Sequence, residues 1–330
     1  MRHFTPISPL RRTLCASFAA IALGALCLPT AHAQSYPNKP IKFVVPFSAG
    51  SATDSVGRIL AQAMSEAWDQ PITVENKAGA NGILGAEVVK AAPADGYTFL
   101  VTTSTTQAAN VHLYRKLSYD PIKDFTPIGK IGETGFILMV TQDFPAKDMK
   151  EFVAYAKAHP GQLAYGHGSS GSLVSAAMLT ELAGLHTVGV PYKSIPPALT
   201  DLLGGQIQFA FADVGNAVSQ MNGGRLRGLG VTTRKRAGKA PGVPPISDTV
   251  KDYNVNAWFG LMAPANLPVD VQRKATATLL AVLAKPEVRE KIQGAGIDLD
   301  VEDSATLAKT IEAEVKKWGV WVKTAGIVPE

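Results

Sequence analysis

Cysteine is nearly missing from this sequence of 330 residues. The two that occur, Cys15 and Cys27, both lie within the first 33 residues. If that segment is removed, the rest of the chain has no thiol and can form neither a disulfide nor a cysteine metal site. Beyond residue 33 there are only four histidines, with no H-E-x-x-H motif and no pair at the spacing of helix-borne ligands. We therefore expect no bound metal.

A large excess of charge of one sign is also absent. The first 33 residues contain three arginines and no acid, so the rest of the chain carries 29 basic and 27 acidic residues, a net charge of +2. Domains that bind nucleic acid usually carry a clear basic surplus on one face. The balance of charge therefore argues against nucleic acid as a partner.

The first 33 residues have the pattern of a cleaved signal peptide. Arg11 and Arg12 end a basic start, an apolar stretch runs from Leu14 to Leu28, and a small-residue site follows at 31–33. The apolar stretch is interrupted by serine and glycine, and it is shorter than the roughly 20 apolar residues of a membrane-spanning helix. We predict cleavage before Gln34 and a soluble exported protein, by either the general secretory or the twin-arginine route.

The remaining chain alternates between short β-rich runs and amphipathic helical stretches. This alternation is typical of an α/β fold with largely parallel strands. After Pro264 we expect helix almost to the end of the chain. The predicted strands are residues 41–45, 72–74, 98–102, 136–140, 163–165, 188–190, 207–211 and 229–232.

Two proline-containing stretches, residues 117–135 and 234–254, have the composition of connections. If the chain leaves one lobe near Gly135 and returns near residues 254–258, it crosses between lobes twice. Two crossings make a hinge, and hinged lobes are a known device for closing on a ligand. The predicted organisation is an α/β protein of two lobes, the first formed by residues 34–135 and 255–330 and the second by residues 136–254.

The loop from Pro46 to Asp54 joins the first predicted strand to the first predicted helix. Its small residues let backbone N–H groups approach an anion, and the helix dipole favours negative charge there. A carboxylate or phosphate would fit this position. The alternative is that Ser51 or Thr53 only caps the helix, while Asp54 complements its first turn.

The loop at residues 165–172 follows another predicted strand, and its glycines satisfy the pattern G-x-G-x-x-G. A dinucleotide site would also need an acidic residue about 20 positions later, at the end of the next strand. That strand ends in Pro191-Tyr192-Lys193 instead, so we expect no nicotinamide cofactor. We interpret the loop as an anion cradle rich in hydroxyls, in which His167 either donates to a ligand or only faces solvent.

Asp213 ends a third predicted strand. Open α/β sheets bind ligands at the carboxyl ends of their strands, so this carboxylate either lines a cleft or caps the helix that follows. No G-x-S-x-G, S-x-x-K or P-loop motif accompanies it. The sequence therefore offers no visible catalytic machinery.

Eight short motifs follow one another in a fixed order along the chain. They are VPF at 45–47, TD at 53–54, VENKAGANG at 74–82, PADGY at 93–97, LSYDPIKDF at 117–125, VPYK at 190–193, ALTDLLGG at 198–205 and WFGL at 258–261. This series resembles the substrate-binding receptors of tripartite tricarboxylate transporters, often called Bug receptors. The resemblance runs from about residue 41 to residue 327, and it departs from the family's usual glycines at Ser51 and Ser194.

The resemblance implies a two-lobed periplasmic binding protein of the Venus-flytrap type. Such a receptor has no catalytic residues and no cofactor. It closes over a small carboxylate, held largely by backbone groups, hydroxyls and waters, and delivers it to membrane transporter subunits; we expect a monomer. The predicted ligand-binding residues are Phe47, Ala49, Gly50, Ser51, Thr53, Asp54, Thr103, Ser104, His167, Gly168, Ser169, Ser170, Gly171, Ser172 and Asp213.

The identity of the ligand stays open between a dicarboxylate, an aromatic acid and an amino acid. Asp54 would pair with the amino group of an amino acid if it pointed into the cleft. Two other functions use related chemistry. One is a co-receptor that reports the ligand to a membrane sensor kinase, and the other is a secreted enzyme that acts on a carboxylated compound.

Overall fold

The computed structural model describes residues 1, 3 and 36–330, and residues 39–330 form one compact unit. The predicted signal peptide and its cleavage before Gln34 lie outside the described residues. Within those residues, no helix combines the length and apolarity needed to cross a membrane.

The first of two sheets has six strands in the order β11-β4-β10-β3-β1-β2. Strand β1 is parallel to β2 and β3, whereas β10 runs antiparallel to β3 and β4, and β11 antiparallel to β4. The strands are β1 (Ile41–Val45), β2 (Ile72–Asn76), β3 (Thr98–Thr103), β4 (Phe125–Thr134), β10 (Ala257–Pro264) and β11 (Asp298–Asp303).

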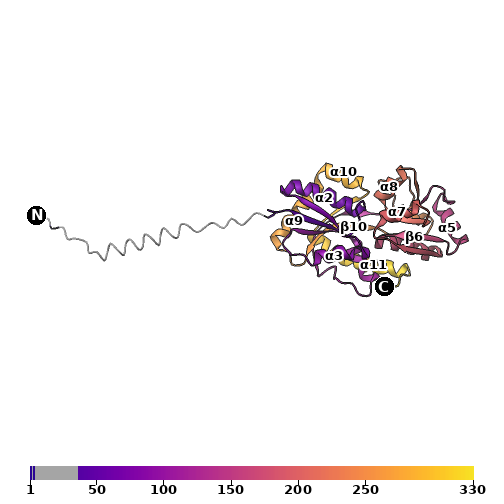
Figure 1. Ribbon diagram of the computed structural model, residues 1–330, viewed down its shortest axis with the longest axis horizontal. Coiled ribbons are helices and arrows are strands. Elements are labelled where there is room, and N and C mark those ends of the chain that lie inside the picture. The colour runs from indigo at the N-terminus through magenta and orange to yellow at the C-terminus, as the bar shows by residue number, and fades with distance from the viewer. Residues whose placement is uncertain (2, 4–35) are drawn as a thin grey trace. The chain divides into compact units, whose positions relative to one another are not determined.

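Helices cover both faces of this sheet (Figure 1). One face shares a buried apolar cluster with α2, α9 and α10, and the other shares a second cluster with α3 and α11. Burial on both faces explains why β1 is a continuous apolar run interrupted only by Lys42. The helices are α2 (Ala52–Trp68), α3 (Ile83–Lys90), α9 (Val269–Ala284), α10 (Pro286–Gly294) and α11 (Ser304–Thr324).

The second sheet has five strands in the order β7-β6-β8-β5-β9. Strand β6 is parallel to its neighbours β7 and β8, while β5 runs antiparallel to β8 and β9. Helices α5 and α6 pack in one cluster with this sheet, and α7 and α8 in another. The elements are β5 (Phe136–Thr141), α5 (Met149–Ala158), β6 (Leu163–His167), α6 (Ser170–Ala183), β7 (Thr187–Pro191), α7 (Ile195–Leu203), β8 (Phe209–Asp213), α8 (Val214–Asn222) and β9 (Leu226–Val231).

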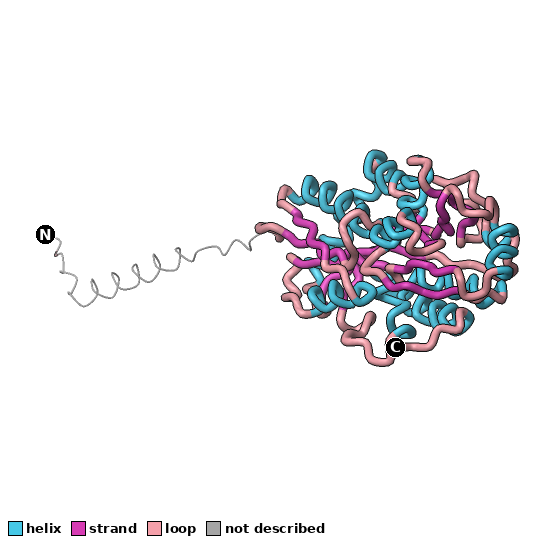
Figure 2. Tube along the Cα trace, turned by 45° about the vertical axis from the view of Figure 1, so that its right-hand side comes forward, coloured by secondary structure: helices cyan, strands magenta, loops and turns pink. Residues whose placement is uncertain are grey.

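Short helical segments complete the unit. They are η2 (Ala80–Gly82), η3 (Thr105–Ala109), α4 (Asn110–Leu113) and η4 (Ile246–Asp248). We call the part built on the six-stranded sheet the first lobe and the part built on the five-stranded sheet the second lobe; Figure 2 shows the strands of the two sheets among their helices. The two-lobed α/β fold predicted from the sequence is confirmed.

The chain passes between the sheets at two places. Gly135 alone separates β4 from β5, and residues 232–256 connect β9 back to β10. The exact lobe limits stay a prediction, because α11 serves both sheets. Its Leu307 belongs to a buried cluster of the first sheet, whereas Trp318 and Val322 belong to a cluster that includes Phe136 of the second sheet.

Three expectations about secondary structure were wrong. Both sheets are mixed rather than largely parallel, because β4, β5, β9, β10 and β11 pair in antiparallel fashion.

The stretch 117–135, expected to be a connection, contains β4. It includes Pro127, which a strand tolerates at an irregularity, and Pro127 lies opposite Met262, where the register with β10 shifts. The region after Pro264 contains the edge strand β11, whose four acidic residues hide its β pattern.

A buried lysine ties the edge strand β11 to the sheet. The Nζ of Lys130 in β4 lies 2.8 Å from Glu133 Oε1, 2.5 Å from Asp300 Oδ2 and 3.2 Å from Glu302 Oε1. Burial alone would lower the pKa of Lys130, but hydrogen bonds to Asp300 and Glu133 raise it above its ordinary value. The register of β11 with β4 shifts between Leu299 and Glu302, so Asp300 lies at this irregularity.

We expect Lys130→Met to lower the free energy of unfolding by about 2 kcal/mol, because three carboxylates lose a shared, buried cation. The control is Lys123→Met, since Lys123 is 83% exposed and lies 3.7 Å from Asp120. This variant should change stability by less than about 0.5 kcal/mol. Urea unfolding of both variants tests the prediction, and equal losses would refute it.

Candidate functional site

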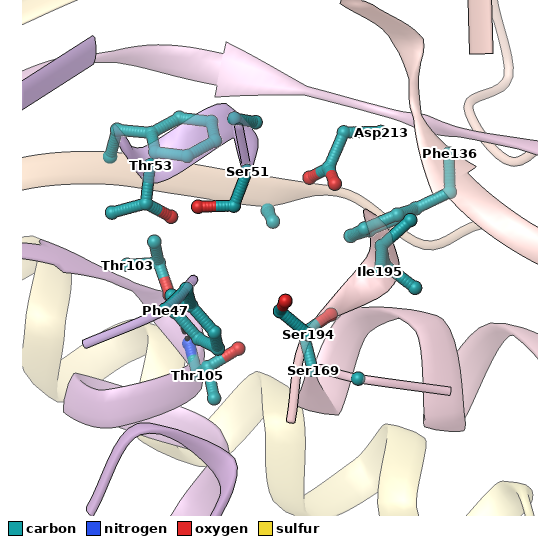
Figure 3. Close-up of a pocket in the computed structure, with 14 residues that line it drawn as sticks. Phe47, Ser51, Thr53, Thr103, Thr105, Phe136, Ser169, Ser194, Ile195 and Asp213 are labelled. Atoms are coloured by element: carbon teal, nitrogen blue, oxygen red, sulfur yellow. Dashed lines mark hydrogen bonds between the residues drawn. The ribbon is translucent and has the colours of Figure 1, made fainter. Parts of the chain in front are cut away.

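A cavity lies between the lobes and is lined from both of them (Figure 3). Its volume, counted as space for the centre of a water molecule, is about 30 Å³, enough for about two waters. Asp213 is the one charged residue among those that line it. The lining residues are Phe47, Ser51, Ala52, Thr53, Thr103, Thr105, Ala257 and Phe259 from the first lobe, and Phe136, Gly168, Ser169, Ser194, Ile195 and Asp213 from the second.

Four helices begin at this cavity. The residues at the N-cap positions of α2, α6, α7 and α8 are Ser51, Ser169, Ser194 and Asp213, and all four line it. The first turn of a helix has backbone N–H groups without intrahelical partners, and the helix dipole adds partial positive charge. The cavity therefore favours an anion even though no basic side chain lines it.

At the start of α2, the polar groups of the loop are largely bonded to one another. Ser51 Oγ accepts a hydrogen bond from the Asp54 N–H at 3.2 Å, and Asp54 Oδ2 accepts from the Gly50 N–H at 3.0 Å. Asp54 also accepts from Arg58 Nε and Asn76 Nδ2, each at 2.9 Å. Burial opposes ionisation of Asp54, but these bonds hold its pKa below the ordinary value. This carboxylate therefore supports the loop and does not line the cavity.

The start of α6 is held by a capping box. Ser169 Oγ accepts from the Ser172 N–H at 3.2 Å, and Ser172 Oγ accepts from the N–H groups of Ser169 and Gly168 at 3.1 Å. A side chain at Gly171 would collide with the ring of Phe136, which lines the cavity. Of these residues, Gly168 and Ser169 face the cavity, while Ser172 and Gly171 hold the loop in shape.

Ser170 connects the lobes instead of lining the cavity. Its Oγ accepts a hydrogen bond from Asn81 Nδ2 at 2.6 Å and donates one to Asn110 Oδ1 at 3.1 Å. Asn81 and Asn110 belong to the first lobe, and Ser170 begins α6 of the second. These bonds fasten the two lobes beside the cavity.

His167 lies in a neighbouring hollow, together with Tyr114, Tyr192, Lys193 and Glu330. Burial lowers the pKa of His167 to about 4, so its ring is neutral at pH 7. It therefore supplies no positive charge to a bound anion. Gly168 lines both this hollow and the cavity, so the two spaces adjoin.

The structure thus brings about half of the predicted residues together. Thr103 lines the cavity while its Oγ1 accepts from the Thr105 N–H at 3.1 Å, whereas Ser104 is fully buried outside it. The predicted residues that line the cavity are Phe47, Ser51, Thr53, Thr103, Gly168, Ser169 and Asp213. Those placed outside its lining are Ala49, Gly50, Asp54, Ser104, His167, Ser170, Gly171 and Ser172.

Ser194 is a lining residue that the sequence interpretation missed. It is 1% exposed, it precedes α7 without making a capping hydrogen bond, and its Oγ has no partner in the described part of the chain. A buried hydroxyl without a partner is costly unless a ligand or water satisfies it. A signal was present, because a serine followed by prolines at the first helical positions marks a helix start. The other missed residues are Ala52, Thr105, Phe136, Ile195, Ala257 and Phe259.

Asp213 ends β8, where it pairs in register with Phe136 of β5. Although it precedes α8, its side chain makes no capping hydrogen bond. In Figure 3 its carboxylate points into the cavity, toward the Ser51 hydroxyl. Burial raises the pKa of Asp213 to about 6, and hydrogen bonding, including that of Asn216, offsets this only in part. Of the two interpretations of this residue, the cleft-lining one fits its placement.

A metal site has no support in the described residues, which contain no group of three histidine, cysteine, aspartate or glutamate side chains placed to hold an ion.

A family model covers most of the chain. The model, described as the tripartite tricarboxylate transporter family receptor, matches residues 56–327. The chain belongs to this family. It is therefore a solute-binding receptor of the periplasmic binding protein class and not an enzyme.

Three solved structures share this fold along their whole length. An R. palustris protein, Rpa4515, solved with adipate, is 31% identical, with a TM-score of 0.87 over 89% of this chain and 100% of its own. The periplasmic binding protein BugD is 30% identical, with a TM-score of 0.85 over the same shares. MatC from Rhodopseudomonas palustris, solved with malate, is 31% identical, with a TM-score of 0.80 over 87% of this chain and 100% of its own.

The raised pKa of Asp213 predicts a pH-dependent stability. Because the folded protein holds this proton more tightly than the unfolded chain, the stabilisation is complete below pH 4 and is lost as the pH rises through about 6. From pH 4 to pH 7, the ligand-free protein should lose about 2 kcal/mol relative to Asp213→Asn. Urea unfolding of both proteins at the two pH values measures this difference. If the stabilities of the two proteins change equally between pH 4 and pH 7, the pKa of Asp213 is not raised.

Proposed function

We propose that this receptor binds one small carboxylate in the cavity and delivers it to the membrane subunits of a tripartite tricarboxylate-type transporter. The observation that carries the proposal is the convergence of four helix N-termini on a cavity lined by hydroxyls and by no basic side chain. Backbone amides and hydroxyls can hold a carboxylate there. Two relatives of the same fold, solved with adipate and with malate, support a carboxylate as the ligand.

Binding requires the lobes to move. The cavity holds about two waters, so a ligand of several carbon atoms enters only when the lobes part. We propose that residues 34–135 and 255–330 move as one lobe against residues 136–254, with Gly135 as one of the two crossings. The ligand then stabilises the closed form by contacts that it makes with both lobes.

We further propose that the chain is exported to the periplasm, that its signal peptide is removed before Gln34, and that the mature receptor acts as a monomer. The basic start, the apolar stretch and the small-residue site of the first 33 residues support this route.

The proposal is tested by thermal unfolding of residues 34–330 after bound ligand has been removed by unfolding and refolding. The panel contains mono-, di- and tricarboxylates, aromatic acids and amino acids. A ligand at 100 times its dissociation constant should add about 2.7 kcal/mol of stability. Recovery of the stabilising acid unchanged supports a receptor. If no acid stabilises the folded protein, the proposed function is wrong.

Ser194→Ala isolates one contact with the ligand. Because Ser194 Oγ has no partner in the described part of the chain, its removal should weaken binding of the stabilising acid by about fivefold to tenfold without lowering stability. The control is Ser175→Ala, which removes another buried hydroxyl without a described partner, in α6 and outside the cavity lining. Equal affinities of the two variants in isothermal titration would exclude Ser194 from the site.

A further inference from the structure

Asp213 gives the cavity an unusual charge for a carboxylate site. No lysine, arginine or histidine is among the lining residues, and the one charged side chain there is this acid. At pH 7.5 most of it is ionised, since burial raises its pKa only to about 6. An ionised carboxylate accepts hydrogen bonds and cannot donate them. Whatever part of the ligand meets Asp213 must therefore supply a proton donor.

Two simpler roles for Asp213 can be compared with other aspartates of this chain. Asp148 and Asp303 also precede helices, and each accepts a hydrogen bond at 2.8 Å from a backbone N–H of the first turn. Asp54 is bonded to Arg58 and Asn76. Asp213 makes no capping bond with the first turn of α8, and hydrogen bonding with Asn216 only partly offsets the effect of burial on its pKa. Its carboxylate is directed into the cavity (Figure 3).

The rest of the lining supplies hydroxyls and apolar side chains but no further charge. Hydroxyls of Thr53 and Thr105 in the first lobe, and of Ser169 and Ser194 in the second, are suited to a ligand carboxylate. The buried, unpartnered Oγ of Ser194 points to a polar partner inside the cavity. A second carboxylate on the ligand, placed against Asp213, would meet like charge in a site that water screens poorly.

We infer that Asp213 determines specificity, and that the ligand is a carboxylate whose other end carries a hydrogen-bond donor, an ammonium, amide or hydroxyl group, that meets Asp213. This inference rests on the proposed function and narrows it. It predicts that a plain dicarboxylate binds more weakly than a donor-bearing acid, that is, an acid of the same length that carries an ammonium, amide or hydroxyl group.

Two matched series of probes test the inference by isothermal titration at pH 7.5. The four-carbon series is succinate, malate, succinamate and aspartate, and the six-carbon series is adipate, adipamate and 6-aminohexanoate. In at least one series, a donor-bearing acid should bind the wild-type receptor about tenfold or more tightly than the plain dicarboxylate, as expected for a hydrogen bond to a charged group.

Asp213→Asn should narrow or reverse that preference, because the new amide donates to a carboxylate and no longer attracts an ammonium group. The control is Asp148→Asn, the same change at a helix start outside the cavity lining, where asparagine caps as well as aspartate does. It should leave the order of affinities unchanged. Asp213→Ser serves as a second variant if Asp213→Asn fails to fold.

The outcomes separate this inference from the proposed function. If the plain dicarboxylate binds as tightly as the donor-bearing acids, or if the order is the same in Asp213→Asn, the inference is wrong while the receptor function stands. If only another acid of the panel stabilises the protein, that acid and its monoamide are compared in the same way, and equal binding overturns the inference. If no carboxylate binds, the proposed function itself fails.

Discussion

The convergence of helix N-termini on one cavity is the constraint on which the rest of this structure depends. In the second lobe, β7 and β8 both run parallel to β6. The carboxyl ends of these three strands therefore meet at one edge of the sheet. Each is followed by a helix that begins at that edge, and the unit β1–α2 of the first lobe faces them. The strand order therefore brings helix N-termini, which favour anions, to one cavity before any charged side chain is added.

A site built from backbone amides requires the lobes to approach each other closely. The backbone of Gly215 at the start of α8 packs against Ala295 and Gly296 of the first lobe so tightly that a side chain at Gly215 would collide with the Ala295 carbonyl. On another side, Asn81 bonds to Ser170 across the lobes. The helix α11 joins the two lobes by packing on both sheets.

The sequence was informative where a local pattern determined the outcome. The apolar run at residues 41–45 and the small-residue loops before α2 and α6 identified part of each lobe's contribution to the cavity. Prediction was poorer where tertiary context decides. Pro127 concealed β4, the acids of β11 concealed an edge strand, and the direction of Asp54 depended on Arg58 and Asn76, which lie outside its loop.

The hardest lining residues to predict were those outside the two small-residue loops before α2 and α6. Phe136 faces it because β5 follows β4 after the single residue Gly135, and Phe259 lines it from β10, a strand that the sequence did not reveal. The sequence around Ser194 marks the start of a helix. It does not indicate that the N-terminus of this helix lies at the same cavity as those of α2, α6 and α8. Local patterns thus pointed to some of the loops that line the cavity, and the topology of the two sheets decides which other residues line it.

The most direct test of this account is a crystal structure of the mature receptor with the carboxylate that stabilises it most. The ligand's carboxylate oxygens should lie within hydrogen-bond distance of backbone amides at the starts of α2 and α6, enclosed by both lobes. A carboxylate bound instead in the hollow beside His167 and Lys193, with the helix starts left unengaged, would contradict it.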